Sequence, residues 1–151
     1  MAVQRNNPYS SFNFLVDFNT GDRDTVRGGF QEVSGMNIEV TSADYRAGNS
    51  AVNHPIKVNG VYKVGDVTLK RGLIGSLDLY DWINSLRTGD HTVLRAVHIS
   101  LQDEAHTGPV MTWTLTNARP LRYVVPSFNA KTGTDVAIEE LVLSIEDLTI
   151  E

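Results

Sequence analysis

Residues 28–82 read GGFQEVSGMNIEVTSADYRAGNSAVNHPIKVNGVYKVGDVTLKRGLIGSLDLYDW, and this stretch decides the fold. A run of strand-forming residues from Val26 to Ser34 ends at Gly35, and a second run occupies Asp66 to Arg71. A long polar segment separates them, from about Met36 to Tyr62. Compact domains rarely keep a connection of this length unless it has a function.

The long segment is not typical of a disordered linker, because it has no run of proline, serine or glycine. Its apolar residues are spaced as in extended chain. We therefore interpret residues of about 36–62 as a protruding arm or hairpin whose apolar side chains contact another subunit. The predicted contact residues of this arm are Ile38, Val40, Tyr45, Arg46, Ile56, Val58 and Val61.

One helix is predicted directly after this stretch, over about residues 76–88. Its apolar residues recur at helical spacing and would form one stripe against a sheet: Leu79, Trp82, Ile83 and Leu86. Ser76 is expected to cap its first turn. Gly89 is expected to end it.

The rest of the chain reads as strands that alternate apolar and polar residues. Phe12–Phe18 is predicted to be half-buried, and further strands are expected near 96–102, 111–116 and 121–125 and from about Asp135 onward. Pro120 should interrupt the middle pair. In the last strand the apolar parity changes near Glu146-Asp147, which indicates a bulge. The expected fold is mainly β, a two-sheet β-sandwich or barrel with one flanking helix and the long protruding arm.

Composition favours one domain over residues 1–151, with no membrane anchor. The first residues do not resemble a secretory signal, and there is no cysteine, so we expect synthesis in the bacterial cytoplasm. Residues 39–71 carry five basic and three acidic side chains, whereas residues 72–151 carry five basic and eleven acidic ones. A mildly basic arm beside an acidic body suits self-association, although an ordinary mixed surface explains it equally well. The acidic balance argues against a dedicated nucleic-acid binder.

No residue pattern indicates catalysis, a cofactor or a metal site. The four histidines are scattered, without the spacing that metal ligands need: His54, His91, His98 and His106. Neighbouring acidic residues, such as Glu139-Glu140, point to opposite faces of a strand, and we interpret them as solvated surface. We therefore expect no enzyme, no cofactor and no bound metal.

The segments FQEVSG, YRAGN and DVTLKRG, followed by the helix with Trp82, resemble the tail tube proteins of contractile injection systems. That family includes the tubes of contractile phage tails and of phage-tail-like extracellular injection particles, with the type VI secretion tube as a distant relative. The resemblance implies six-subunit rings of this chain stacked around a continuous lumen. It also implies a contractile sheath protein, baseplate and terminator proteins, and a cargo of DNA or protein effector as partners.

If the chain forms such a tube, one polar strand face lines the channel. The candidates are Thr112, Thr114 and Thr116, together with Glu140, Ser144 and Glu146. Threonine is also a common strand residue on any wet face, so solvent exposure explains the ladder as well.

Two alternatives stay open at this stage. The first is a paralogous ring subunit that initiates the tube at the baseplate. The second, from a different class, is a monomeric β-sandwich module that binds, for instance, glycans. A stable monomer in light scattering at all concentrations would favour the binding module.

Overall fold

The structure is a computed structural model that describes residues 2–19, 29–131, 133 and 135–151. Most elements are strands that follow the alternation of the sequence, and α1 is the one helix within these residues. The elements, in chain order, are β1 Phe14–Asp17, β2 Glu32–Ser34, β3 Ile38–Tyr45, β4 Ile56–Val64, β5 Val67–Gly72, α1 Asp78–Arg87, β6 Arg95–Gln102, β7 Pro109–Val124, β8 Ile138–Ser144 and β9 Asp147–Ile150.

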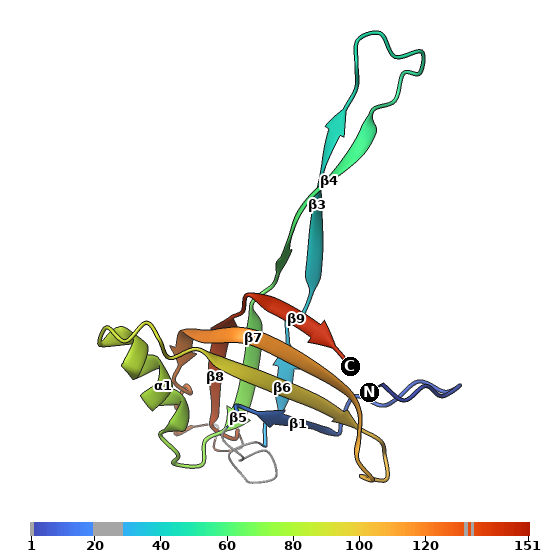
Figure 1. Ribbon diagram of the computed structural model, residues 1–151. Helices are drawn as coiled ribbons and strands as arrows, with labels where there is room; N and C mark the ends of the chain where they lie inside the picture. Colours follow the sequence, from blue (N-terminus) through green and yellow to red (C-terminus); the bar gives the residue numbers. More distant parts are fainter. Residues whose placement is uncertain (1, 20–28, 132, 134) are drawn as a thin grey trace.

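Seven of the strands form the body, in the order β1-β6-β7-β8-β5-β2 with β9 on β7, and all their pairings are antiparallel. The first half of β7 lies between β6 and β9, whereas its second half pairs with β8. The path therefore divides into two layers around one core (Figure 1). We call β1-β6-β7-β9 the first sheet and β7-β8-β5-β2 the second sheet. The strands β1 and β2 end the path, and within the described residues they do not pair with each other, so the barrel is not closed.

The core lies between the two sheets and under α1. Val16, Ile99 and Leu115 enter it from the first sheet, and Leu69 and Leu141 from the second. Leu79 and Trp82 are the buried face of α1, as the helical stripe predicts, and the indole N–H of Trp82 donates to the Val93 carbonyl at 2.8 Å. The fold class expected from the sequence is thus confirmed, with the barrel left open.

Pro120 does not interrupt a strand, contrary to the prediction. It is buried within the sixteen-residue β7, and the register of β7 against β8 shifts between Pro120 and Arg122. This is also where β7 leaves β6 and β9 and begins to pair with β8. Proline has no backbone N–H to donate to a neighbouring strand. It is tolerated here because the register shift means that no such hydrogen bond is needed at this position.

The parity change near Glu146-Asp147 also has a different cause from the predicted bulge. β8 belongs to the second sheet, and β9 pairs with β7 in the first. The chain crosses between the layers over Ile145 and Glu146, where the Glu146 N–H donates to the Thr116 carbonyl at 3.0 Å. A change of sheet reverses the direction of the core, so the apolar parity must change with it.

Three local expectations need adjustment. Phe12 is exposed, and the first strand begins only at Phe14. The run Val26–Ser34 contributes the short β2, and its residues 26–28 lie outside the described part of the chain. Ser76 does not cap α1 through a good backbone bond. Its hydroxyl donates to the Asp78 carboxylate at 2.9 Å.

Within the described residues, no helix is long and apolar enough to cross a membrane.

Candidate functional site: the arm and two polar sheet faces

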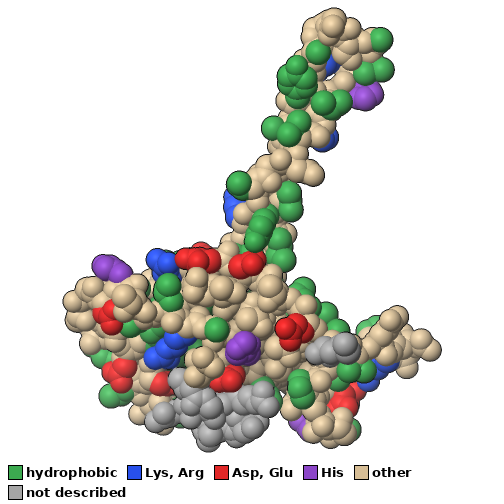
Figure 2. Space-filling model, in the orientation of Figure 1, with side chains coloured by type: hydrophobic (Ala, Val, Ile, Leu, Met, Phe, Trp, Pro, Cys, Tyr) green, Lys and Arg blue, Asp and Glu red, His purple; other side chains and the backbone are tan. Residues whose placement is uncertain are grey.

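The predicted arm is a two-stranded antiparallel hairpin, β3 and β4, that projects far from the body (Figure 1). Every residue of β3 and every residue of β4 except Val64 is exposed. Large apolar side chains are among them, and hydrophobic atoms are visible along the arm in Figure 2. A lone two-stranded hairpin is marginally stable in water at best. The arm therefore has the composition of a segment that is covered when assembled.

A β-bulge divides the arm into two halves. Val40 pairs with Tyr62, and Ser42 pairs with Asn59, so β4 holds one extra residue between these pairs. The Thr41 hydroxyl donates to the Val61 carbonyl at 2.7 Å. A Cβ at Gly60 would lie 2.6 Å from that hydroxyl, so a larger residue there would displace the Thr41 side chain and its bond to Val61.

The bulge moves the apolar residues to the other face of the ribbon. In the half near the body, Ile38 and Val40 occupy even positions of β3 and oppose Val64 and Tyr62. In the outer half, the odd positions are apolar, and the pairs are Ala43 with Val58 and Tyr45 with Ile56. Directly opposed residues share a face, so each half has one apolar face. We call Tyr45, Ile56 and Val58 the outer apolar face. Asp44 and Lys57 form an ion pair of 2.6 Å on the reverse side.

Arg46, one of the predicted contact residues, makes hydrogen bonds within its own loop. Its guanidinium donates to the carbonyls of Val52 at 3.0 Å and Ser50 at 3.3 Å, both in its own loop. The Ser50 N–H also donates to the Ala47 carbonyl at 3.1 Å. Arg46 thus orders the tip of the arm from within, and this explains why the loop keeps a defined shape despite its exposure.

The foot of the arm is held tightly to the body. Gly35 has a φ of +89°, and a Cβ there would lie 2.3 Å from the Asp66 carbonyl oxygen, so only glycine fits. The Tyr62 hydroxyl donates to Asp147 of β9 at 3.2 Å. The charge of the Asp147 carboxylate, and then that hydrogen bond, raise the pKa of Tyr62. These contacts fix the direction in which the arm leaves the body.

The three predicted threonines lie together on the outer face of the first sheet. Thr112 pairs with Ser100, and Thr114 pairs with His98 on one side and Thr149 on the other. Hydroxyl and imidazole contacts run along these rows, at 3.3 Å between Ser100 and Thr112 and 3.2 Å between His98 and Thr114. This face is continuous, polar and built largely of short side chains.

The other predicted lumen residues lie elsewhere. Glu140 and Ser144 are on the outer face of the second sheet, opposite the buried Leu141 and Leu143. Glu146 lies in the link between the sheets and accepts a hydrogen bond from Asn117 at 2.7 Å. Because both sheets cover the same core, their outer faces point in opposite directions. The structure therefore separates the predicted set into two surfaces.

A buried ionic cluster was missed by the sequence analysis. Arg71 and Glu139 are each 1% exposed and directly opposed on β5 and β8, with the guanidinium 2.6 Å from the Glu139 carboxylate. Arg71 also pairs with Asp78 at the start of α1, at 2.7 Å, and Tyr123 donates to Glu139 at 2.6 Å. Reading Glu139 as solvated surface was wrong. The sequence does contain a signal for this burial. Arg71 continues the alternation of Val67 and Leu69, so it lies on the apolar face of its strand.

The cluster changes the acidity of its members. Burial alone would lower the pKa of Arg71, but its hydrogen bonds to Asp78 and Glu139 outweigh burial and raise it. Burial would likewise raise the pKa of Asp78, yet the bonds from Arg71 and Ser76 lower it. Burial, together with the bond to Glu139, raises the pKa of Tyr123 to about 12. These pKa shifts mean that the cluster stabilises the charged forms of Arg71 and Asp78 and the neutral form of the Tyr123 phenol.

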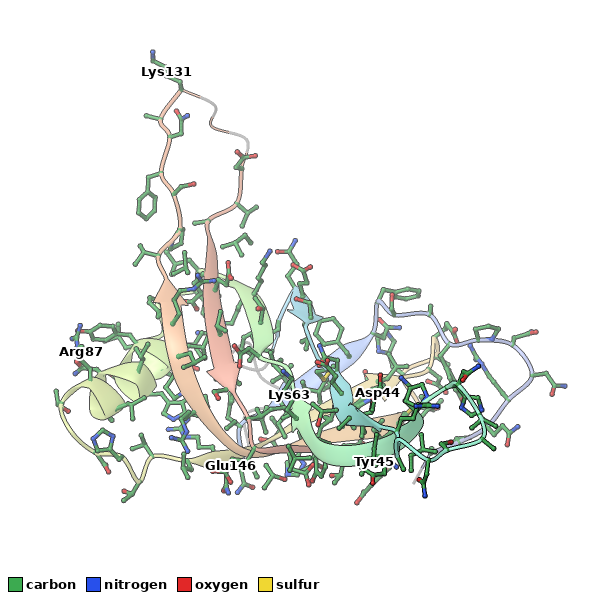
Figure 3. The ribbon with its side chains drawn as sticks, turned by 90° about the horizontal axis from the view of Figure 1, so that it is seen from above. Asp44, Tyr45, Lys63, Arg87, Lys131 and Glu146 are labelled. Carbon is green, nitrogen blue, oxygen red and sulfur yellow. The ribbon has the colours of Figure 1, made fainter. Side chains whose placement is uncertain are left out.

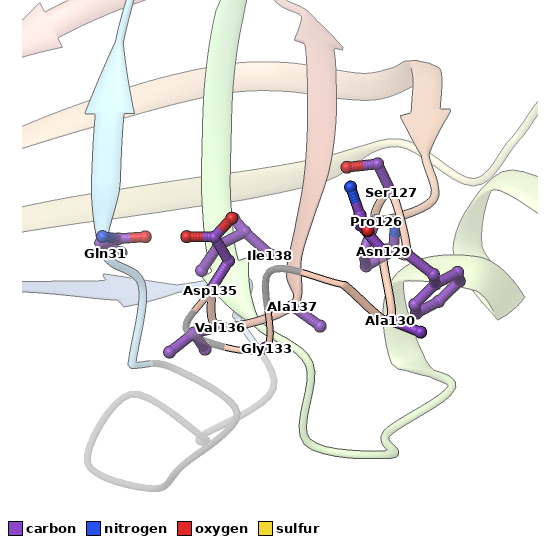
Figure 4. A pocket seen from close by; sticks show the side chains of 11 residues that line it. Gln31, Pro126, Ser127, Asn129, Ala130, Gly133, Asp135, Val136, Ala137 and Ile138 are labelled. Atoms are coloured by element: carbon purple, nitrogen blue, oxygen red, sulfur yellow. The ribbon is translucent and has the colours of Figure 1, made fainter.

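A second projection is formed by the chain between β7 and β8. Seen from above, it carries Lys131 at its end and leaves the body in a different direction from the arm (Figure 3). Phe128 and Val136 are both 75% exposed on it. A hollow of about 820 Å³ lies between this projection and Gln31 (Figure 4). No cluster of histidine and carboxylate side chains that could hold a metal occurs among the described residues.

Residues 10–149 match the family model of the T4-like virus tail tube protein gp19. No curated protein sequence matches the chain. The fold is similar to a chain in the sheath-tube complex of the extracellular contractile injection system PVC in its extended state. The two share 31% identity over 95% of this chain and 91% of that chain, with a TM-score of 0.81.

Two further solved structures have a similar fold, both at lower sequence identity. A chain of the anti-feeding prophage cap, the AFP tube terminating cap, is 27% identical over 100% of this chain and 95% of that chain, with a TM-score of 0.82. Hcp1 from Flavobacterium johnsoniae is 15% identical over 91% of this chain and 93% of that chain, with a TM-score of 0.51. The likeness to Hcp1 shows the fold alone.

Proposed function

Because the chain belongs to the tail tube protein family of T4-like viruses, we propose that it is a structural subunit of the inner tube of a contractile phage tail or phage-tail-like injection system. Its 151 residues form one tube domain that assembles as six-subunit rings, and the rings stack into a conduit. The observation that carries this proposal is the arm, a projecting hairpin whose apolar side chains are exposed in the single chain.

The mechanism is one of assembly, not of catalysis. A contact between unlike surfaces of two copies repeats from subunit to subunit, closing a ring where the rotation permits. Axial contacts between rings extend the tube. A contractile sheath around the tube supplies the motion, and the tube acts as a rigid needle and passage for DNA or protein effector. The subunit is made in the bacterial cytoplasm and joins baseplate and terminator proteins in the particle.

The channel wall is the outer face of the second sheet, which carries Glu140 and Ser144. The strands β2 and β5 of this sheet continue directly into the arm, so an arm seated on a neighbour extends this sheet across the subunit boundary. On this face Glu32 pairs with Lys70 at 3.1 Å and Glu140 pairs with Arg122 at 3.7 Å, so basic and acidic groups offset each other. A wall without excess positive charge would not retain a polyanion, whereas a basic wall would bind one. The threonine face of the first sheet then points away from the channel.

A pair of single cysteines separates the two faces, and the chain has no cysteine of its own. In free subunits a bulky maleimide should label Ser144→Cys and Thr114→Cys to the same extent. In long tubes without sheath, we expect labelling to be lost at Ser144→Cys and kept at Thr114→Cys. The reverse pattern would assign the lumen to the threonine face, and equal labelling would refute a lumen on either face.

The arm is tested by replacing residues 38–64 with a short turn. The shortened chain should fold and remain monomeric in light scattering, because every buried core residue lies outside the replaced segment, which removes only Val64 from the side chains packed against the core. A matched pair of point variants refines the test. Ile56→Asp places a charge on the outer apolar face and should abolish tubes, whereas Asp44→Asn on the reverse face should leave them. Normal tubes from the shortened chain would refute the role of the arm in assembly. A full-length chain that stays monomeric at all concentrations would refute the tube function and favour a monomeric binding module.

A ring subunit at one end of the tube is the second candidate function. A chain of the PVC sheath/tube terminator is 31% identical over 97% of this chain, with a TM-score of 0.82, and a chain of the AFP baseplate is 25% identical over 97%. Electron microscopy of the purified chain separates the candidates. A main tube subunit forms long tubes, whereas an end subunit stops at single rings.

A further inference from the structure

The open side of the barrel contains an apolar crevice. It has a volume of about 350 Å³ and lies between β1 and β2, the two ends of the strand path, which do not pair with each other. Its apolar lining is continuous with the core and consists of Phe14, Val33, Met36, Ile99, Leu101 and Trp113. Ser11, Gln31 and Glu32 complete the lining with polar groups. Within the described part of the chain, this edge of the core is therefore open to solvent.

We propose that this crevice receives the outer apolar face of the arm, Tyr45, Ile56 and Val58, from a second copy of the chain. The inference rests on the proposed function, because it names the surface on which the arm docks. Both surfaces are apolar and both are exposed in the single chain. Each would shield the other from water in a complex of two copies. The three side chains are exposed by 59%, 57% and 48%, respectively, so docking removes a large apolar area from water.

The occupant cannot be the arm of the same chain. Met36 lines the crevice and lies two residues before β3 begins, so the crevice is at the foot of the chain's own arm. The eight residues of β3, at roughly 3.3 Å each, carry the tip about 26 Å away from that foot. The hairpin runs away from the body (Figure 1), and the contacts at Gly35 and Tyr62 fix its direction.

Electrostatics favour a second copy over an unrelated apolar segment. The arm carries Arg46, Lys57 and Lys63 against Glu39 and Asp44, whereas the remainder of the chain carries more acidic than basic residues. An arm of net positive charge is therefore attracted to the acidic body of another copy. Because the crevice and the outer apolar face are different surfaces, the same contact can repeat from copy to copy, as a heterologous ring or stack requires.

Disulfide trapping tests this docking, again using the absence of cysteine. One protein carries Val58→Cys on the outer apolar face, and a second, affinity-tagged protein carries Ser11→Cys at the crevice. The control carries Leu77→Cys, which lies in a separate exposed apolar patch beside α1. After co-assembly and mild oxidation, we expect the tagged covalent dimer with Ser11→Cys and not with Leu77→Cys.

The outcomes separate this inference from the proposed function. Tubes that give no dimer with Ser11→Cys overturn the crevice as the docking site while the tube function stands, and a dimer with Leu77→Cys assigns the arm to the helix side. A wild-type chain that never assembles refutes both proposals.

Trp113 gives a second readout, because it lines the crevice whereas Trp82 is buried in the core. Assembly should shift tryptophan emission to shorter wavelength, and Trp113→Phe should abolish the shift. A shift that is unchanged in Trp113→Phe would contradict occupation of the crevice.

Discussion

Replacing Arg71 with methionine should destabilise the folded chain by about 3–5 kcal/mol, the usual cost of leaving one member of a buried ion pair without its partner. Methionine retains much of the length of the side chain, and it can still pack near the ring of Phe30, which lies 5.4 Å from the guanidinium. The loss is therefore mainly electrostatic. Asp78 can turn toward water, because its side chain is 24% exposed, but Glu139 at 1% cannot.

The magnitude follows from what remains around Glu139. In the variant, the carboxylate keeps the Tyr123 hydrogen bond of 2.6 Å and loses two guanidinium bonds of 2.6 and 2.8 Å. Each hydrogen bond to a charged group contributes about 1.5–3 kcal/mol, so two such bonds agree with the value expected for a stranded charge. The double variant Arg71→Met with Glu139→Gln removes that charge and should recover part of the loss.

Urea unfolding followed by tryptophan fluorescence measures the change in the free energy of unfolding. The comparison requires that this free energy depends equally steeply on urea concentration in both proteins. The matched control is Arg122→Met. Arg122 also pairs with a glutamate, Glu140 at 3.7 Å, but its side chain is 67% exposed, and the expected cost is under about 1 kcal/mol. If Arg71→Met does not fold, Glu139→Gln alone supplies the milder test. Equal costs for Arg71→Met and Arg122→Met would refute the reasoning.

Three further predictions follow from particular groups. Gly60→Ala should disorder the arm without changing the melting temperature of the body, seen as faster amide exchange in residues 38–64, whereas Gly48→Ala, which has open space around it, should have no effect. Tyr123 keeps its proton up to a pKa of about 12 in the folded chain but loses it near 10 when unfolded. Its contribution to stability is thus complete below pH 10 and is lost as the pH rises toward 12. Tyr123→Phe should remove that part of the alkaline decline, and a decline of unchanged size would contradict the assignment. We also expect elemental analysis of the purified protein to find no stoichiometric transition metal. One tightly held metal ion per chain would contradict this.

The sequence by itself determined the features that depend on neighbours along the chain. Alternation identified the strands, helical spacing identified the buried face of α1 at Leu79 and Trp82, and the length of the polar segment indicated the arm. These signals are local, because the period of a strand or helix is set by its own backbone. The resemblance to tail tube proteins likewise rested on contiguous segments, and it is confirmed by the family match over residues 10–149.

Tertiary structure alone decided which surfaces meet. Alternation showed that the threonines lie on the polar face of one strand and Glu140 on the polar face of another. Only the pairing of β7 with strands of both sheets places those two faces on opposite sides of the core. The same pairing accommodates Pro120 inside a strand, and the register of β5 against β8 turns Arg71 and Glu139 into a buried pair. Each of these features depends on contacts between residues far apart in the chain. Their energies depend on burial and register that no local pattern contains.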